Sequence, residues 1–138
     1  MDVRVIVFRD GEILLIKEKE DGLWSLPGGW ADIGESPAEA TAREVREESG
    51  YRMRAVKLAS LYNRDRQVPV PIPYHFYKLN FLCEILPNEE PEPWVDAAGV
   101  GVFGEVNLPS LYLTRVIPPL ISCFFEHHRN PNLPTDFD

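Results

Sequence analysis

Runs of apolar residues separated by turn signals predict that the first part of the chain is rich in β-strands. Residues 3–8 are mostly β-branched or apolar, Asp10-Gly11 is a strong hairpin signal, and residues 13–16 supply the returning strand. A shorter strand is expected at 23–26, and Pro27-Gly28-Gly29 should end it. The pattern therefore predicts a hairpin followed by one short strand.

The next segment predicts a helix with well-defined ends. Ser36 is the expected N-cap, Pro37 occupies the first helical position, and Glu39 completes a capping box. Gly50 supplies the C-terminal stop. At ~100° per residue, the side chains expected on the packing face are small enough to let the helix lie close against a sheet. They are Ala38, Ala42, Val45 and Ser49.

The rest of the chain alternates strands and proline-containing loops before a second helix. The expected elements are a strand at 55–62, a loop at 64–73, a strand at 74–85, an acidic loop at 86–98, a strand at 99–103, a helix within 113–128 beginning near Pro118, and a tail at 130–138. We find no internal repeat or interdomain linker. We therefore expect one α/β domain at 1–129, with a mixed sheet and helices on its faces, followed by a polar tail at 130–138.

Composition narrows the choice of partners. A chain of 138 residues with a net charge of −8 can bury a core, but it lacks the basic stripe that nucleic-acid binding needs. A small anionic ligand stays compatible, because a bound cation can reverse the local field.

The cysteines and the hydropathy of the chain indicate the cellular compartment in which the protein is expected. The two cysteines, Cys83 and Cys123, lie in apolar runs and have neither metal-ligand spacing nor a disulfide framework, so we expect a reducing compartment. Apolar runs fall short of the ~20 residues that span a bilayer. The N-terminus is interrupted by charges, unlike a signal peptide. We expect a cytoplasmic protein with no membrane partner.

Three acidic side chains share a stripe of the predicted helix. Glu44, Glu47 and Glu48 stand at i, i+3 and i+4, where like charges destabilise a helix by roughly 0.2–0.5 kcal/mol per pair. Glu47 and Glu48 also lie in the last turn, where the helix dipole disfavours anions. A hard divalent cation would offset both effects, and Mg²⁺ or Mn²⁺ prefers such oxygen ligands. The stripe therefore predicts metal-dependent phosphate chemistry.

Residues 29–51 follow the pattern G-x5-E-x7-R-E-V-x-E-E-x-G-Y. This pattern resembles the signature of the Nudix hydrolases, in which the last position is a bulky aliphatic residue; here Tyr51 departs from it. The matching positions are Gly29, Glu35, Arg43, Glu44, Val45, Glu47, Glu48 and Gly50. So many fixed positions at fixed spacing are far more specific than a lone glycine motif.

The resemblance implies an α/β/α sandwich that hydrolyses a nucleoside diphosphate linked to a second group X. It implies that Glu44, Glu47 and Glu48 bind the metal, with the Gly28 carbonyl adding a ligand. Arg43 would orient a glutamate of the site, and Glu47 at i+4 is the candidate. The residues expected to support the site's backbone are Gly29, Glu35 and Gly50.

Some family members take a general base or a further ligand from a later loop. Here Asp96 is the first candidate and Glu92 the second; if neither reaches the metal, Glu47 or Glu48 must activate the water. Side chains that could contact substrate, against the alternative of ordinary packing or surface roles, are Trp30, Arg64, Arg66, Tyr74 and His75.

The segment GWADIGESP and the later Pro73-Tyr74-His75 further resemble bacterial relatives that act on ADP-ribose-like or CDP-alcohol-like substrates. Those relatives carry a helical domain ahead of the Nudix domain, and we expect no counterpart of it here. Hydrolysis of nucleoside triphosphates and nucleotide sensing without catalysis stay open as alternatives. RNA end processing is disfavoured by the acidic charge. Relatives often dimerise, so a homodimer also stays open.

Overall fold

The computed structural model describes residues 1–87, 91 and 95–138, and its larger sheet has five strands. The strand order is β5-β1-β7-β6-β9; β1 runs parallel to β7 and antiparallel to β5, so the sheet is mixed as predicted. The bounds are β1 Asp2–Ile6, β5 Gly28–Trp30, β6 Met53–Asn63, β7 Tyr77–Ile85 and β9 Asp136–Phe137.

The smaller sheet contains the turn of the predicted hairpin, but the strand predicted at 3–8 is divided: residues 3–6 belong to β1 of the larger sheet, and Phe8 pairs with Ile13 of the returning strand. Strand β3 (Glu12–Lys17) pairs with β2 (Phe8–Arg9), β4 (Trp24–Ser25) and β8 (Gly99–Phe103). The turn between β2 and β3 has positive φ at Asp10 (52°) and Gly11 (79°), which a tight two-residue hairpin requires. The pairing of β8 with β3 confirms the strand predicted at 99–103.

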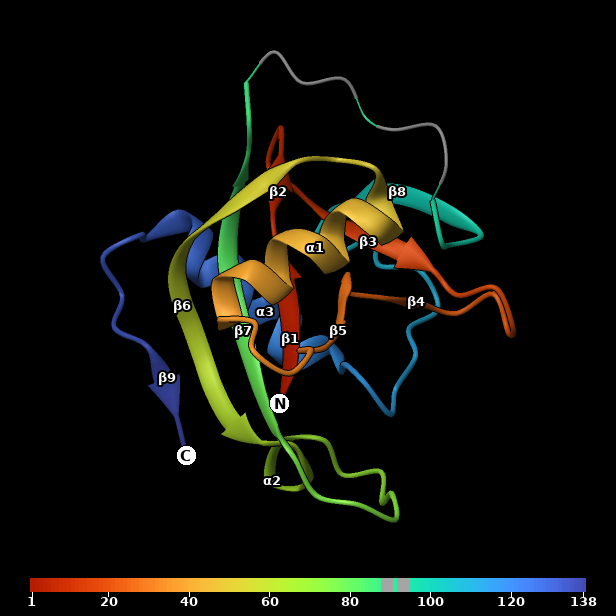
Figure 1. Ribbon diagram of the computed structural model, residues 1–138, viewed down its shortest axis with the longest axis vertical. Helices are drawn as coiled ribbons and strands as arrows, with labels where there is room; N and C mark the ends of the chain where they lie inside the picture. Colours follow the sequence, from red (N-terminus) through yellow and green to blue (C-terminus); the bar gives the residue numbers. More distant parts are fainter. Residues whose placement is uncertain (88–90, 92–94) are drawn as a thin grey trace.

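Two helices cover the strands from opposite sides, which gives the α/β/α layering (Figure 1). On one side, α1 (Pro37–Ser49) packs Val45 against Val5 of β1. On the other side, α3 (Pro118–Arg129) packs Phe124 into a core with Ile6. The predicted start of α3 at Pro118 is confirmed.

Both predicted caps of α1 are present, but its predicted packing face is partly wrong. Ser36 Oγ accepts the Glu39 N–H at 3.1 Å, and Gly50 closes the helix in the left-handed conformation. The side chains buried against the sheet are Ala40, Thr41, Val45 and Ser49, whereas Ala38 is exposed. The helix is rotated from the expected orientation because Ala40 packs on Val3 of β1.

Several other boundaries differ from prediction. The glycine pair expected to end a strand belongs to β5, because Gly28 and Gly29 pair with Arg4 and Val3 of β1. Residues 64–67, expected in a loop, form the one-turn helix α2 (Arg64–Gln67) because the Asn63 side chain caps it. Tyr74 and His75 lie before β7 instead of opening it.

The C-terminal segment is docked by hydrogen bonds. Strand β9 runs parallel to β6, pairing Asp136 with Ser60. Thr135 Oγ1 donates to the Leu58 carbonyl at 2.7 Å, and the His127 ring lies 3.0 Å from Asp136. These contacts fix residues 135–137 along strand β6 and make β9 the edge strand of the sheet.

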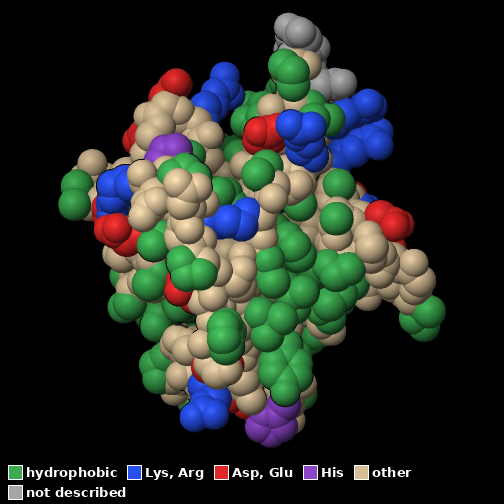
Figure 2. Space-filling view, turned by 90° about the vertical axis from the view of Figure 1, so that its left-hand side faces the viewer, with side chains coloured by type: hydrophobic (Ala, Val, Ile, Leu, Met, Phe, Trp, Pro, Cys, Tyr) green, Lys and Arg blue, Asp and Glu red, His purple; other side chains and the backbone are tan. Residues whose placement is uncertain are grey.

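The side of the molecule that carries β6 and β9 is partly apolar. Figure 2 shows hydrophobic side chains gathered on this face. Val56 of β6 and Phe137 of β9 are exposed hydrophobic residues. A homodimer stays a prediction. Across the residues whose structure is described, no helix is both long and apolar enough to cross a bilayer.

Candidate active site

The glycine pair of β5 lies directly against the acidic stripe of α1. Glu48 Oε1 accepts the Gly28 N–H at 3.0 Å, so the end of the helix is tied to the strand. A Cβ on Gly29 would stand 2.8 Å from Glu44 Oε1, and one on Gly28 would stand 2.0 Å from the Val3 carbonyl. Larger residues would therefore displace the carboxylates or the strand.

The close approach of Glu44 and Glu48 is electrostatically unfavourable when both carboxylates are charged and no cation is bound. The pKa of Glu48 is raised to about 8, chiefly by burial and also by the neighbouring Glu44, while Arg4 and the Gly28 N–H act in the opposite direction. A divalent cation between the carboxylates would stabilise their charged forms. The donor set, hard oxygens beside a close backbone approach, fits Mg²⁺ or Mn²⁺.

The third glutamate of the stripe is more exposed than Glu44 and shares the Arg43 guanidinium with it. Glu47 is 55% exposed, and its Oε2 lies 3.3 Å from Arg43 Nη1. Within 1–87, 91 and 95–138, no three carboxylate, imidazole or thiol side chains are already gathered as an ion site. Glu44 and Glu48 lie together beside β5, and metal binding by Glu44, Glu47, Glu48 and the Gly28 carbonyl stays a prediction.

Arg43 connects the loop before α1, strand β5 and the acidic stripe through hydrogen bonds to Glu35, the Trp30 carbonyl and Glu44. Its Nε and Nη2 donate to both carboxylate oxygens of Glu35, at 2.8 and 2.9 Å, and Nη1 donates to Glu44 at 3.1 Å. Nη2 also donates to the Trp30 carbonyl at 3.2 Å. The hydrogen bonds to Arg43 hold the pKa of Glu35 below its usual value, and those to Glu35 raise the pKa of Arg43. The predicted contact with Glu47 is present, whereas the bidentate pair with Glu35 was not anticipated.

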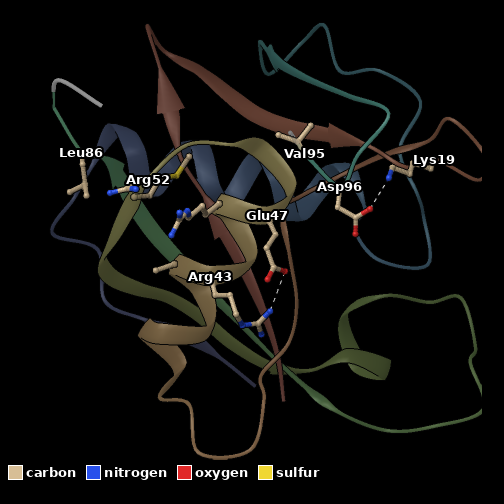
Figure 3. A pocket seen from close by; sticks show the side chains of 10 residues that line it. Lys19, Arg43, Glu47, Arg52, Leu86, Val95 and Asp96 are labelled. Carbon is tan, nitrogen blue, oxygen red and sulfur yellow. Dashed lines mark hydrogen bonds and ion pairs between the residues drawn. The ribbon is translucent and has the colours of Figure 1, made fainter. Parts of the chain in front are cut away.

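A cavity of about 810 Å³ opens beside the end of α1 (Figure 3). Glu47, Arg43 and Asp96 line it, although Asp96 is distant from the helix in sequence. The Asp96 N–H donates to the Glu47 carbonyl at 2.7 Å, and its carboxylate pairs with Lys19 at 2.8 Å. The backbone of Asp96 therefore lies beside Glu47, whereas its carboxylate is paired with Lys19, and Glu44 and Glu48 do not line this cavity. Glu92, the second choice, falls outside the described residues.

The side chains predicted to contact substrate separate into different surroundings. Trp30 and Tyr74 approach each other around Phe76, with ring centroids 4.8 and 5.9 Å from the Phe76 ring. His75 lines a separate apolar cavity with Trp30 and pairs with Asp65.

The two arginines of α2 differ in exposure. Arg66 is exposed. The expectation that Arg64 contacts a phosphate is wrong, because Arg64 is fully buried and donates to the Thr114 carbonyl at 2.6 Å and to the Val70 carbonyl.

Sequence reasoning missed two buried basic residues. Arg4 and Lys78 are 7% and 2% exposed and lie on neighbouring strands β1 and β7. Arg4 pairs with Asp2 at 3.1 Å. Each is a basic residue inside a largely apolar strand, and hydrophobic periodicity alone does not show whether such a residue is buried.

Comparison with known proteins agrees with this geometry. The model of the NUDIX domain family matches residues 1–108. A Bacillus subtilis protein provisionally named an ADP-ribose pyrophosphatase is 39% identical over 99% of this chain, which spans 65% of that protein's length. An ADP-ribose pyrophosphatase of Methanocaldococcus jannaschii is 32% identical over 77% of this chain and 62% of its own.

Solved structures of pyrophosphatases have the same fold as this chain. The structure of a Streptococcus suis ADP-ribose pyrophosphatase has a TM-score of 0.88 at 32% identity, covering 99% of this chain and 97% of that one. That of a UDP-X diphosphatase has a TM-score of 0.88 at 25% identity, covering 100% of this chain and 66% of the other. The family match, the layered fold and the glutamates beside Gly28-Gly29 agree: this chain belongs to the Nudix family.

Proposed function

We propose that this protein is a divalent-metal-dependent pyrophosphohydrolase that cleaves a nucleoside diphosphate derivative into a nucleoside monophosphate and phosphoryl-X. The observation that carries the proposal is the convergence of Glu44 and Glu48 on Gly28-Gly29. The names of the similar proteins, ADP-ribose pyrophosphatase and UDP-X diphosphatase, support the reaction class. ADP-ribose-like and CDP-alcohol-like compounds are the first substrates to test.

The proposal gives each residue a distinct task. Glu44 and Glu48, joined by Glu47, would hold Mg²⁺ or Mn²⁺. The bound ion supplies an activated water and neutralises charge on the phosphates. Arg43 keeps Glu44 oriented through its bond to Oε1 while Glu35 fixes the guanidinium. Asp96 would accept a proton from water in the cavity that it shares with Glu47.

Two alternatives concern the same site. A nucleoside triphosphate presents the same bond type, so triphosphates belong in the substrate panel. A nucleotide sensor would bind without cleavage. The glutamate set favours catalysis, because a sensor needs no pair of partly buried carboxylates beside the glycines of β5.

The decisive experiment is incubation with ADP-ribose, CDP-choline, UDP-glucose and nucleoside triphosphates in Mg²⁺ or Mn²⁺, with products identified by mass. We expect monophosphate release that EDTA abolishes. Glu48→Gln should lose turnover while remaining folded, whereas Glu39→Gln, an exposed change on the same helix, should retain it. Binding without cleavage would support the sensor, and an active Glu48→Gln would overturn the assignment.

A further inference from the structure

A second cavity, of about 260 Å³, lies on β1 and β7 away from α1. We call it the β1–β7 cavity. Its lining combines aromatic rings with buried charges from four separate parts of the chain. The lining residues are Asp2, Arg4, Trp30, Ile72, Tyr74, Phe76, Lys78, Tyr112, Thr114 and Arg115. The volume is below the ~300–1,000 Å³ of pockets that hold whole ligands, so one ring system fits better than a complete nucleotide.

The aromatic side of this cavity is built for a flat ring. The Trp30 and Phe76 rings meet edge to face at 4.8 Å with an interplanar angle of 70°. Trp30 and Tyr74 remain 50% and 55% exposed, so their surfaces are not used up by the core. Large aromatic surfaces left half-exposed at a cavity mouth are available for stacking.

The charged side of the cavity offers hydrogen-bond donors, but the positive charges of Arg4 and Arg115 are already balanced by carboxylates. Asp2 pairs with Arg4, and Glu18 pairs with Arg115 at 2.6 Å. The Lys78 ammonium lies 3.9 Å from Asp2, beyond hydrogen-bond distance. Among the residues that the structure describes, its one hydrogen bond goes to the Arg115 carbonyl. An ammonium has three donors and no acceptor, so donors remain for a ligand oxygen.

This balance favours an uncharged acceptor over a phosphate. Arg4 already donates to Asp2 and to the Leu26 carbonyl, and Arg115 already has a carboxylate partner. Lys78 alone is left to oppose a dianion. A ring carbonyl needs one good donor and an aromatic surface, and both are present.

The cavity is linked to the metal site by shared residues. A cluster formed by Lys19, Asp96 and Arg115 lines a further cavity of about 220 Å³; Lys19 and Asp96 also line the cavity at Glu47, and Arg115 lines the β1–β7 cavity. The Trp30 carbonyl accepts a hydrogen bond from Arg43. A ligand in the β1–β7 cavity would therefore lie next to the proposed catalytic groups.

We propose that the β1–β7 cavity holds the base of the nucleotide substrate and that Lys78 selects pyrimidines, whose ring carbonyl oxygens accept its hydrogen bond, over adenine. Adenine has no ring carbonyl and offers only ring nitrogens as acceptors, whereas cytosine and uracil both carry the O2 carbonyl. This inference rests on the proposed function, because it assigns a subsite of the same substrate. It favours the CDP-alcohol and UDP-linked compounds over ADP-ribose.

The test compares substrates that differ only in the base. UDP-glucose and ADP-glucose share the same X group, and their kcat/KM values are measured with Mg²⁺ for the wild type, Lys78→Met and Lys17→Met. Lys17 lies on β3 and serves as the matched control. In parallel, calorimetry without metal measures the binding of UMP and AMP, which carry the same phosphate.

We expect UDP-glucose to exceed ADP-glucose by roughly tenfold to a hundredfold in kcat/KM, the range of one hydrogen bond to a charged group. UMP should bind more tightly than AMP. Lys78→Met should bring both ratios close to one, and Lys17→Met should leave them unchanged. A melting curve for each variant confirms folding, and the wild-type ratios test the proposal even if Lys78→Met does not fold.

The two proposals fail in different ways. Cleavage of both sugars with equal efficiency, together with equal binding of UMP and AMP, would overturn the pyrimidine subsite and leave the hydrolase standing. Preferential UMP binding that depends on Lys78, without cleavage of any substrate, would support the subsite and overturn the hydrolase. A uridine preference that survives in Lys78→Met would also overturn the role of Lys78.

Discussion

The guanidinium of Arg43 donates to both carboxylate oxygens of Glu35, at 2.8 and 2.9 Å, and so joins the loop before α1 to the helix itself. The same guanidinium reaches Glu44 at 3.1 Å. Planar, two-point pairing of this kind is specific to arginine, because an ammonium is a single point of charge. The position of Glu44 therefore depends on an interaction that lysine cannot reproduce.

We predict that Arg43→Lys lowers kcat/KM and metal affinity by about 10–100-fold, the usual effect of losing a group that orients a ligand. The melting temperature should change little, because Arg43 lies at the surface end of the network. Metal titration and steady-state kinetics measure the effect. Arg129→Lys, in an exposed ion pair on α3, is the control and should behave as wild type. Unchanged metal affinity in Arg43→Lys would contradict the orienting role.

Gly29→Ala tests the close approach of β5 to α1. The new Cβ would stand 2.8 Å from Glu44 Oε1, and this carboxylate can move because it ends a flexible side chain. We therefore expect a small loss of stability, below about 1 kcal/mol, and a loss of activity of at least tenfold. Gly99→Ala, whose nearest contact is an ordinary 3.6 Å, is the control. Full activity in Gly29→Ala would show that the placement of Glu44 is not critical.

Asp96→Asn tests the general base. If Asp96 accepts the proton from water, kcat should fall by roughly 10²–10⁴-fold while KM changes little. The hydrogen bond from the Asp96 N–H to the Glu47 carbonyl uses the backbone and should persist in the variant. Asp10→Asn in the β2–β3 turn is the control. An Asp96→Asn enzyme with wild-type kcat would transfer the role to Glu47 or Glu48.

Lys78 makes stability depend on pH in a defined direction. Burial lowers its pKa from 10.5 to about 7, with Arg4, Arg64 and Arg115 adding to the shift and Asp2 opposing it. The folded protein thus binds fewer protons than the unfolded chain between about pH 7 and 10.5, so this group's contribution to stability rises with pH across that window.

We predict that Lys78→Met is most stabilised relative to wild type at or below pH 7, where the ammonium is charged and buried. The advantage should shrink by up to about 1.4 kcal/mol per pH unit above pH 7. Denaturant unfolding of both proteins at pH 6, 8 and 9.5 measures the difference, in which the titrations of other groups cancel. A difference independent of pH would show that Lys78 titrates normally in the folded state.

Local sequence signals account for much of the fold. The turn at Asp10-Gly11, the caps Ser36 and Gly50, and the proline at the start of α3 were all predicted, because each acts on its own backbone. The Glu44, Glu47 and Glu48 stripe was also predicted, because helical spacing alone places it. Residues 29–51 likewise carry enough fixed positions to indicate the family, which the match over 1–108 confirms.

Long-range packing decided the rest. The buried face of α1 is set by contact with Val3, and the burial of Arg64 is set by the Thr114 carbonyl. The cavity that brings Lys78 beside Trp30 and Arg115 joins segments far apart in the chain. No local rule relates such segments, since their contacts depend on the strand order and register of the whole sheet. The sequence by itself thus determined the elements and the acidic stripe, while tertiary structure decided which charges are buried and which side chains face a common cavity.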